Sequence, residues 1–227
     1  MVSSYCLLCG SAYQTSGSFS DWLFGNSVID PLCSPCKNRC HYIQGPICQD
    51  CGRPSQVELC ADCRIWRTKY DFVLTNRALL SYDSFLKDFM HQYKFVGDYR
   101  LRSAFSSELK EKFGKQISQS ALVISVPVSR QTMRERGFNQ VKGLFAFAEK
   151  KMRNDILYVA DKKQTSKLDR RDRLNKANLF FLKNKDCAEN EIILLDDVYT
   201  TGTTLHQAAA CLYEAGAKKI STISLAR

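Results

Sequence analysis

The chain has 227 residues and a formal net charge of +10, and hydrophobic residues make up 44% of it, which is ordinary for a globular protein with a real core. No apolar stretch approaches the roughly 18 residues that a membrane helix needs, and the start of the chain lacks a basic segment followed by an apolar one. We therefore expect a cytoplasmic protein with no signal peptide and no membrane insertion. The basic excess is concentrated in residues 130–185, which carry sixteen Lys and Arg against six Asp and Glu. Such a concentration suits an anionic partner, either pyrophosphate or nucleic acid.

Cysteines dominate the first part of the chain. Eight of them form four C-x-x-C pairs, which are Cys6/Cys9, Cys33/Cys36, Cys48/Cys51 and Cys60/Cys63. A C-x-x-C turn aims two thiolates at one centre, and two such turns complete a tetrahedral zinc site. In a cytoplasmic protein this pattern indicates metal or redox chemistry more readily than disulfides. We predict one or two structural zinc ions, with redox-active dithiols as the alternative.

Two ways of combining the four pairs are open. Joining the first pair to the second and the third to the fourth closes shorter loops, so it costs less chain entropy and we favour it over an interleaved arrangement. Cys40 and His41 could also enter either site. We expect residues 1–69 to form a small zinc-ribbon-like module, because the cysteines stop there and β-branched and aromatic residues begin. Residues 70–227 would then form the second domain.

The second domain shows an α/β pattern. The apolar spacing predicts helices at 84–95, 101–113, 139–151 and 205–215, with Ser84 capping the first and Gly216 ending the last. It predicts strands at 79–83, 121–127, 156–159 and 219–226, and a further strand that begins at Glu191. Unbroken apolar runs such as that at 121–127 are typical of a parallel sheet covered on both faces.

The strand that begins at Glu191 ends in two adjacent acids, Asp196 and Asp197. A turn of small residues follows, consisting of Thr200, Thr201, Gly202, Thr203 and Thr204. Ligands of open parallel sheets lie beyond the carboxyl ends of the strands, and the N–H groups at a strand-to-helix turn bind anions. Carboxylates suit ribose hydroxyls or a cation, and the turn suits a 5-phosphate. A Walker B strand also ends in acids, but it needs a G-x-x-x-x-G-K-[ST] loop, which this sequence lacks.

The motif at 191–204 resembles the phosphoribosyl pyrophosphate (PRPP) signature of type I phosphoribosyltransferases. The resemblance implies that the acids hold the ribose and that the turn holds the 5-phosphate. It also implies that the loop after the strand at 121–127 binds pyrophosphate, a role that suits the planar fork of arginine. We assign this role to Ser129 and Arg130, with Arg134 and Arg136 nearby. The alternative for the last two is a solvated position or pairing with Glu135 and Glu149.

Residues 161–173 are basic and lack an apolar period. A long polar segment inside a compact domain is usually functional or mobile. Loss of pyrophosphate generates an oxocarbenium-like centre that water would trap, and a closing loop excludes water and brings cations to the leaving group. We expect a lid that uses Gln164, Lys167 and Arg171; a plain surface loop is the alternative.

Several motifs together resemble the ComF family: the C-x-x-C pairs, R-E-R-G-F-N-Q at 134–140, Q-T-S at 164–166 and D-D-V-Y-T-T-G at 196–202. The resemblance covers essentially the whole chain. It implies a role in natural competence and DNA uptake, with single-stranded DNA and a DNA-translocating ATPase of the competence operon as partners. One expected function is Mg²⁺-dependent transfer of ribose 5-phosphate from PRPP to an unknown acceptor. The other is a catalytically silent module that binds single-stranded DNA or a helicase.

Overall fold

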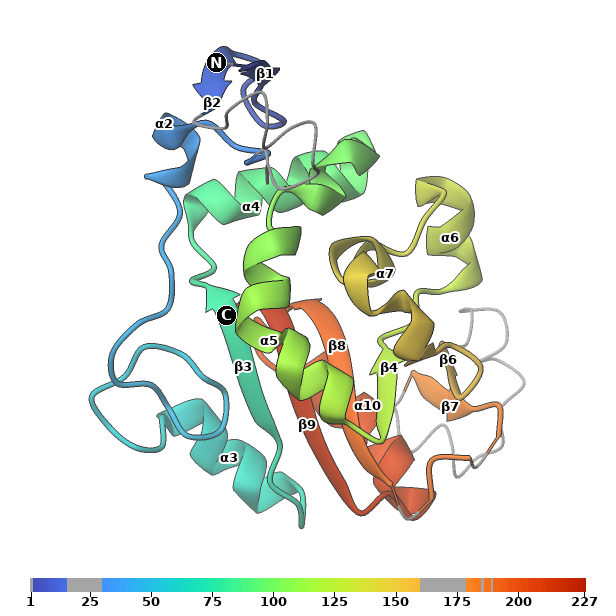
Figure 1. The fold of residues 1–227 in the computed structure, drawn as a ribbon. Coiled ribbons are helices and arrows are strands. Elements are labelled where there is room, and N and C mark those ends of the chain that lie inside the picture. The colour runs from blue at the N-terminus through green and yellow to red at the C-terminus, as the bar shows by residue number, and fades with distance from the viewer. Residues whose placement is uncertain (1, 16–29, 160–178, 185, 189) are drawn as a thin grey trace.

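A parallel sheet lies at the centre of the structure, a computed structural model that describes residues 2–15, 30–159, 179–184, 186–188 and 190–227 (Figure 1). Within these residues the sheet has five strands in the order β3-β9-β8-β4-β5, and every neighbouring pair is parallel. The strands are β3 (Thr75–Leu80), β9 (Lys219–Ala226), β8 (Glu191–Val198), β4 (Leu122–Ser125) and β5 (Met152–Arg153). The predicted α/β architecture, a parallel sheet flanked by helices, is confirmed.

Helices cover both faces of the sheet because its central strands are apolar on both sides. On β8, Ile193 and Leu195 pack into a hydrophobic cluster that also contains residues of α4 (Ser84–His91), α5 (Ser106–Gln119) and α7 (Gln140–Leu144). Ile192 and Leu194 alternate with them and pack into a second cluster with α10 (Thr203–Glu214). Successive side chains of a strand point to opposite faces, so a continuous apolar run is the pattern that a sheet covered on both faces requires.

The first strand of this sheet begins earlier than predicted. The expected bounds of this strand, 79–83, are wrong, since β3 runs from Thr75 to Leu80. Its beginning is hidden in the sequence because Asn76 is polar yet fully buried. The Asn76 side chain accepts hydrogen bonds from the hydroxyl groups of Thr222 and Ser224 on β9, at 2.8 and 3.3 Å.

Other boundaries also differ from the prediction. Asp83, and not Ser84, caps α4, since its carboxylate accepts the Leu86 N–H at 2.9 Å. The expected helix at 101–113 is a 3₁₀ helix, η2 (Tyr99–Ser103), followed by α5. The expected helix at 139–151 is likewise α7 followed by a 3₁₀ helix, η3 (Ala146–Lys151). The arginine-rich stretch that was expected to be a loop contains a short helix, α6 (Arg130–Arg136).

The cysteine-rich part lies in two places. The antiparallel pair β1 (Val2–Tyr5) and β2 (Ala12–Thr15), with α2 (Ser34–Lys37), lies beside α4, whereas α3 (Ala61–Lys69) lies near β3 (Figure 1). Cys6, Cys33 and Cys36 belong to the hydrophobic cluster that contains α4. Cys48, Cys51, Cys60 and Cys63 belong to the cluster that contains α10. The division of the chain at Tyr70 remains a prediction.

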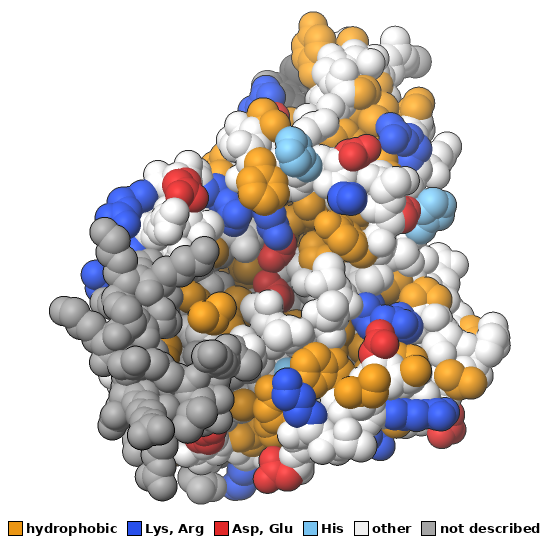
Figure 2. Space-filling view, turned by 180° about the vertical axis from the view of Figure 1, so that it is seen from behind, with side chains coloured by type: hydrophobic (Ala, Val, Ile, Leu, Met, Phe, Trp, Pro, Cys, Tyr) orange, Lys and Arg blue, Asp and Glu red, His pale blue; other side chains and the backbone are white. Residues whose placement is uncertain are grey.

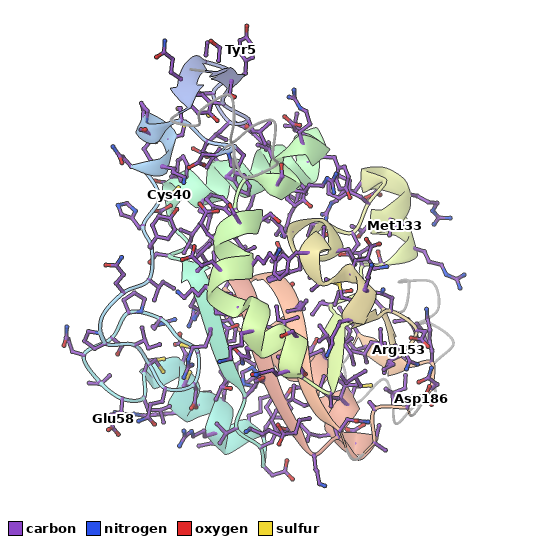
Figure 3. All side chains as sticks on the ribbon, viewed as in Figure 1. Tyr5, Cys40, Glu58, Met133, Arg153 and Asp186 are labelled. Atoms are coloured by element: carbon purple, nitrogen blue, oxygen red, sulfur yellow. The ribbon has the colours of Figure 1, made fainter. Side chains whose placement is uncertain are left out.

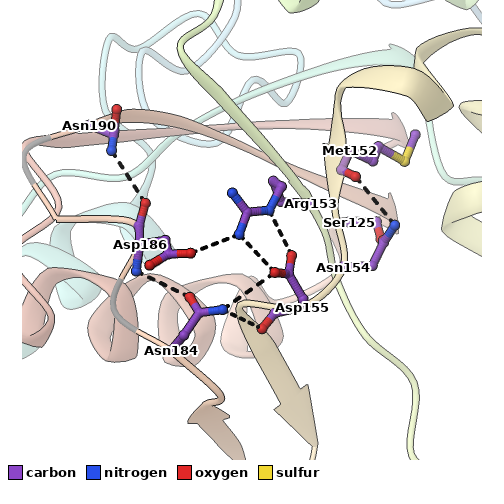
Figure 4. A network of polar contacts seen from close by, with 8 residues as sticks. All are labelled: Ser125, Met152, Arg153, Asn154, Asp155, Asn184, Asp186 and Asn190. Atoms are coloured by element: carbon purple, nitrogen blue, oxygen red, sulfur yellow. Dashed lines mark hydrogen bonds and ion pairs between the residues drawn. The ribbon is translucent and has the colours of Figure 1, made fainter.

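A small antiparallel pair, β6 (Leu157–Val159) and β7 (Phe180–Leu182), lies beside the sheet. A polar network holds its base: Arg153 donates to Asp155 at 2.7 Å and to Asp186 at 3.0 Å, and Asn184 donates to the Asp155 carbonyl at 3.1 Å (Figure 4). The predicted lid residues 164, 167 and 171 lie between these strands and outside the described residues. Among the described residues, no helix has the length and apolar character to cross a membrane.

Candidate functional site

The acid pair lies near the end of β8, which continues to Val198, and is buried in the protein, with Asp196 5% and Asp197 4% exposed. Because the two residues are consecutive on a strand, their side chains leave opposite faces of the sheet. Asp197 forms an ion pair with Lys94 and accepts a hydrogen bond from the Gln140 side chain at 3.4 Å. Asp196 accepts the backbone N–H of Asp197 at 2.9 Å. The pair therefore combines a neutralised carboxylate with one that has no cation in contact among the described residues.

Burial raises the pKa of Asp196 well above its ordinary value, and the charge of the neighbouring Asp197 raises it further. A buried carboxylate is costly to ionise unless hydrogen-bond donors or a cation satisfy it. The hydroxyl groups of a sugar, or a bound cation, would supply this missing stabilisation. The acid pair is thus chemically suited to the ligand class that its sequence predicted.

Three residues around the acid pair were not assigned to it from the sequence. Arg136 donates to the backbone carbonyl of Lys94 at 3.1 Å and also to the Gln140 side chain. It thereby contacts both residues whose side chains contact Asp197. Burial lowers the pKa of Arg136. Figure 2 shows acidic and basic side chains close together near the centre of one face of the molecule. Gln140 belongs to the R-E-R-G-F-N-Q motif, whereas nothing in the local sequence marks Lys94.

The turn after β8 has the features of an anion-binding loop. Gly202 has a φ of +85° and precedes the first residue of α10. All four threonines of the turn are exposed, and the Thr201 and Thr203 hydroxyls lie 3.0 Å apart. Among the described residues, none accepts a hydrogen bond from the N–H groups of Thr200, Thr201 or Gly202. Free N–H groups at the start of a helix bind anions through hydrogen bonds and the helix dipole.

The second predicted loop lies at the end of β4. Ser129 caps α6, since its hydroxyl oxygen accepts the Thr132 N–H at 3.0 Å. Arg130 and Arg134 are exposed, and Arg136 is tied to Lys94 and Gln140. The structure therefore leaves Arg130 and Arg134 accessible, whereas Arg136 is largely occupied within the protein.

A cavity of about 560 Å³ lies between α6, α7 and the β6–β7 pair. Arg130, Lys142 and Lys183 line it, and its described lining contains no Asp or Glu. Met133 also lines it from α6, which projects from the body of the protein (Figure 3). The cavity is therefore open to an anionic ligand on the side where pyrophosphate was predicted.

The eight paired cysteines form two groups of four. Cys6, Cys9, Cys33 and Cys36 form the first, Cys48, Cys51, Cys60 and Cys63 form the second, and within each group all sulfur atoms lie within 4.8 Å of one another. This is the sequential combination that we favoured. All eight are free thiols, and all but Cys9 are buried. Four converging thiols fit a closed tetrahedral zinc site, so each group would hold one structural ion.

One cysteine of each group lies in an environment that favours the thiolate. Hydrogen bonds from the Cys63 thiol and, more weakly, from the Arg53 backbone and the Arg227 side chain lower the pKa of Cys51 to about 4. In the first group, hydrogen bonds from Ser11 are the main cause that lowers the pKa of Cys9 to about 6. Cys40 and His41 join neither group: Cys40 contacts the Cys36 carbonyl, and His41 pairs with Asp83.

Comparison with known proteins decides the family. The "Competence protein ComFC" of Streptococcus pneumoniae (strain ATCC BAA-255 / R6) is 36% identical over 222 residues, which are 98% of this chain and 99% of that protein. The chain belongs to the ComFC family. The ComFC of Bacillus subtilis (strain 168) is 35% identical over 98% of this chain and 94% of its own length. The family resemblance that the motifs indicated is thereby confirmed.

More distant comparisons add less. "Competence protein F" of Haemophilus influenzae is 25% identical over 86% of this chain and 90% of that protein. No protein-family model matches the chain. Among solved structures, a hypoxanthine phosphoribosyltransferase from Staphylococcus aureus aligns with 54% of this chain and 61% of its own, with a TM-score of 0.36 and 13% identity. A similarity this low decides neither fold nor substrate.

Proposed function

We propose that this ComFC-family protein binds PRPP or a related ribose 5-phosphate compound beyond the carboxyl end of β8. One observation carries the proposal: a buried pair of carboxylates lies near the end of β8, shortly before a loop in which the N–H groups of Thr200, Thr201 and Gly202 have no described partner. Few ligands need hydrogen-bond acceptors and anion-binding donors side by side. A phosphorylated sugar needs both.

Each part of the ligand has a matching group. The ribose hydroxyls would donate to Asp196 and Asp197, and the 5-phosphate would accept from the loop that contains Thr200, Thr201, Gly202, Thr203 and Thr204. Pyrophosphate would lie towards Ser129 and the exposed Arg130, with Arg134 at the rim.

A magnesium ion would bind together with PRPP. Mg²⁺ is a hard cation that prefers carboxylate and phosphate oxygens, and the acid pair offers carboxylate oxygens next to the loop. When bound, it would neutralise charge on the pyrophosphate group. The raised pKa of Asp196 is consistent with a carboxylate that lacks such a charge partner.

The reaction that this arrangement would serve is pentosyl transfer. The bond from the anomeric carbon to pyrophosphate breaks with its electron pair leaving on pyrophosphate, and a bond to an acceptor nucleophile forms. The residues of the chain would orient the sugar, hold the leaving group and exclude water. The relatives are competence proteins by name, so we place this activity in DNA uptake.

Calorimetric titration with PRPP tests the proposal. We expect Mg²⁺-dependent binding by the wild type and a loss of affinity of at least tenfold in the Asp196→Asn/Asp197→Asn variant. Glu191→Gln is the matched control because Glu191 is exposed and begins β8, at the end of the strand opposite the acid pair. Absence of PRPP binding, or binding unchanged in the acid-pair variant, would refute the assignment.

A second candidate is binding of single-stranded DNA, with or without a helicase partner. The cavity beside α6 carries three cations, and the rings of Tyr158 and Phe181 at its edge lie 5.6 Å apart. Cations with aromatic rings are the usual combination for single strands. If Lys142 and Lys183 contact phosphates, the affinity for a labelled oligonucleotide should fall with salt by about 0.7 log units per contact, per log unit of salt. Salt-independent binding would argue against this candidate.

A further inference from the structure

At the loop proposed to bind the phosphate, the carbonyl groups from Tyr199 to Gly202 each accept a hydrogen bond. The Arg227 guanidinium donates to the Thr200 carbonyl at 2.7 Å and to the Tyr199 carbonyl at 3.3 Å. The Trp66 indole N–H donates to the Thr201 carbonyl at 2.9 Å. The carbonyl of Gly202 accepts the His206 backbone N–H at 2.9 Å. Four successive peptide groups are therefore held by their oxygen atoms, which fixes the direction of the N–H groups that would receive the phosphate.

The Arg227 and Trp66 side chains also connect the loop to the second cysteine group. Arg227 donates to the Cys51 sulfur at 3.1 Å from the other nitrogen of its guanidinium. Trp66 lies on α3, the helix that Cys60 caps and that contains Cys63. Two single side chains, Arg227 and Trp66, therefore connect the second cysteine group to the loop independently of each other.

The Trp66 ring contributes a third contact. It stacks on His206 of α10 with ring centroids 4.1 Å apart and an interplanar angle of 13°. His206 Nδ1 in turn lies 2.9 Å from the Gly202 carbonyl. By contrast, within the described residues no hydrogen bond joins the first cysteine group to this loop.

We propose that zinc bound by Cys48, Cys51, Cys60 and Cys63 positions the phosphate-binding loop through Trp66 and Arg227, so that zinc and the sugar phosphate bind cooperatively. This inference rests on the proposed function. Zinc fixes the two C-x-x-C turns, and structural zinc contributes directly to folding free energy. Those turns set the start of α3 and the position of the Cys51 sulfur, and hence where Trp66 and Arg227 place their donors. Linkage requires that the phosphate-bound loop strengthens zinc binding by the same factor.

Two variants separate this coupling from general packing. Arg227→Met keeps the length of the side chain and removes its donors, and Trp66→Phe keeps an aromatic ring on His206 and removes the indole N–H. Arg53→Met is the control, because Arg53 also lies beside this cysteine group but pairs with Asp62 and does not contact the loop.

The readout is the dissociation constant of PRPP with Mg²⁺, measured by calorimetry on zinc-replete protein. Arg227→Met is expected to weaken binding about tenfold, which corresponds to about 1.4 kcal/mol. Trp66→Phe is expected to weaken it about threefold, and Arg53→Met should leave it unchanged. If the wild type binds PRPP and both Arg227→Met and Trp66→Phe bind it with the wild-type dissociation constant, the coupling is overturned and the proposed function stands.

Zinc affinity gives the reciprocal measurement. In equilibrium competition with a chromogenic chelator, saturating PRPP should lower the dissociation constant of one zinc ion and leave that of the other unchanged. Cys9→Ser disrupts the first group, so the zinc ion whose affinity responds to PRPP should still bind in this variant. If PRPP changes the affinity for neither ion, or only for the ion that Cys9→Ser loses, the proposal is overturned.

Zinc binding measured without PRPP tests the structural link separately from the proposed function. Arg227→Met should bind one zinc ion more weakly than Arg53→Met even without PRPP. A wild type that binds no PRPP would overturn the proposed function and the cooperativity together. If zinc binding in Arg227→Met also equalled that in Arg53→Met, the structural link itself would be refuted.

Discussion

Replacement of Gly202 by alanine should damage both the stability of the fold and ligand binding. Gly202 has a φ of +85°, a conformation that costs an L-residue about 1–2 kcal/mol. An added Cβ would also overlap the Tyr199 hydroxyl and lie 2.7 Å from its ring carbon Cε1. Tyr199 is 2% exposed and packs in the core, so overpacking should add about 1–3 kcal/mol. We expect a total loss of about 2–5 kcal/mol in the free energy of unfolding.

Gly97 provides a matched control. Its φ is +80°, and an added Cβ would meet no atom within 4 Å. Gly97→Ala should therefore show the backbone cost alone, about 1–2 kcal/mol. The difference between the two variants isolates the contact with Tyr199.

Urea unfolding of zinc-replete protein measures both losses from the midpoints at equal slope. PRPP affinity should fall in Gly202→Ala and stay within about twofold of the wild type in Gly97→Ala. Equal losses of stability in the two variants, or unchanged PRPP affinity in Gly202→Ala, would show that Tyr199 yields freely and that the loop is not held as described.

Three further outcomes follow from the described contacts. Elemental analysis of metal-replete protein should give two zinc ions per chain, and fewer than one would contradict the cysteine assignment. Asp196→Asn should unfold at higher urea concentration than the wild type at neutral pH, because burial and Asp197 raise the pKa of Asp196. The native state then binds more protons, so wild-type stability should fall as pH rises from about 3.9, and this component should be absent in the variant. Hydrogen bonds from Arg153 are the main cause that lowers the pKa of Asp155 to about 2, so its stabilising effect should be lost as pH falls from about 3.9 towards 2, and Arg153→Met should raise that pKa in an NMR titration.

The central strands were predictable because local sequence and tertiary environment agree there. The run from Glu191 is apolar on both faces, and the observed β8 is buried on both faces. The acids that follow it could be recognised because two adjacent carboxylates at the end of a buried strand have no packing role. The combination of the C-x-x-C pairs was also predictable, since chain entropy favours closing the shorter loops.

What escaped prediction depends on contacts between distant segments. The buried side chain of Asn76 in β3 is satisfied by hydroxyl groups of β9, a distant segment of the chain. Lys94 and Asp197 lie far apart in the chain, and no local pattern connects them. The same is true of Trp66 and Arg227, whose donors reach the loop after β8 from α3 and from the residue after β9. Their roles follow from the packing of the sheet and not from any motif.

A crystal structure of the protein with PRPP and Mg²⁺ would locate the bound ligand. We expect the 5-phosphate within hydrogen-bond distance of the N–H groups of Thr200, Thr201 and Gly202, with the ribose hydroxyls at Asp196 and Asp197. Ordered PRPP in the cavity beside α6, with no phosphate at the loop after β8, would contradict this expectation.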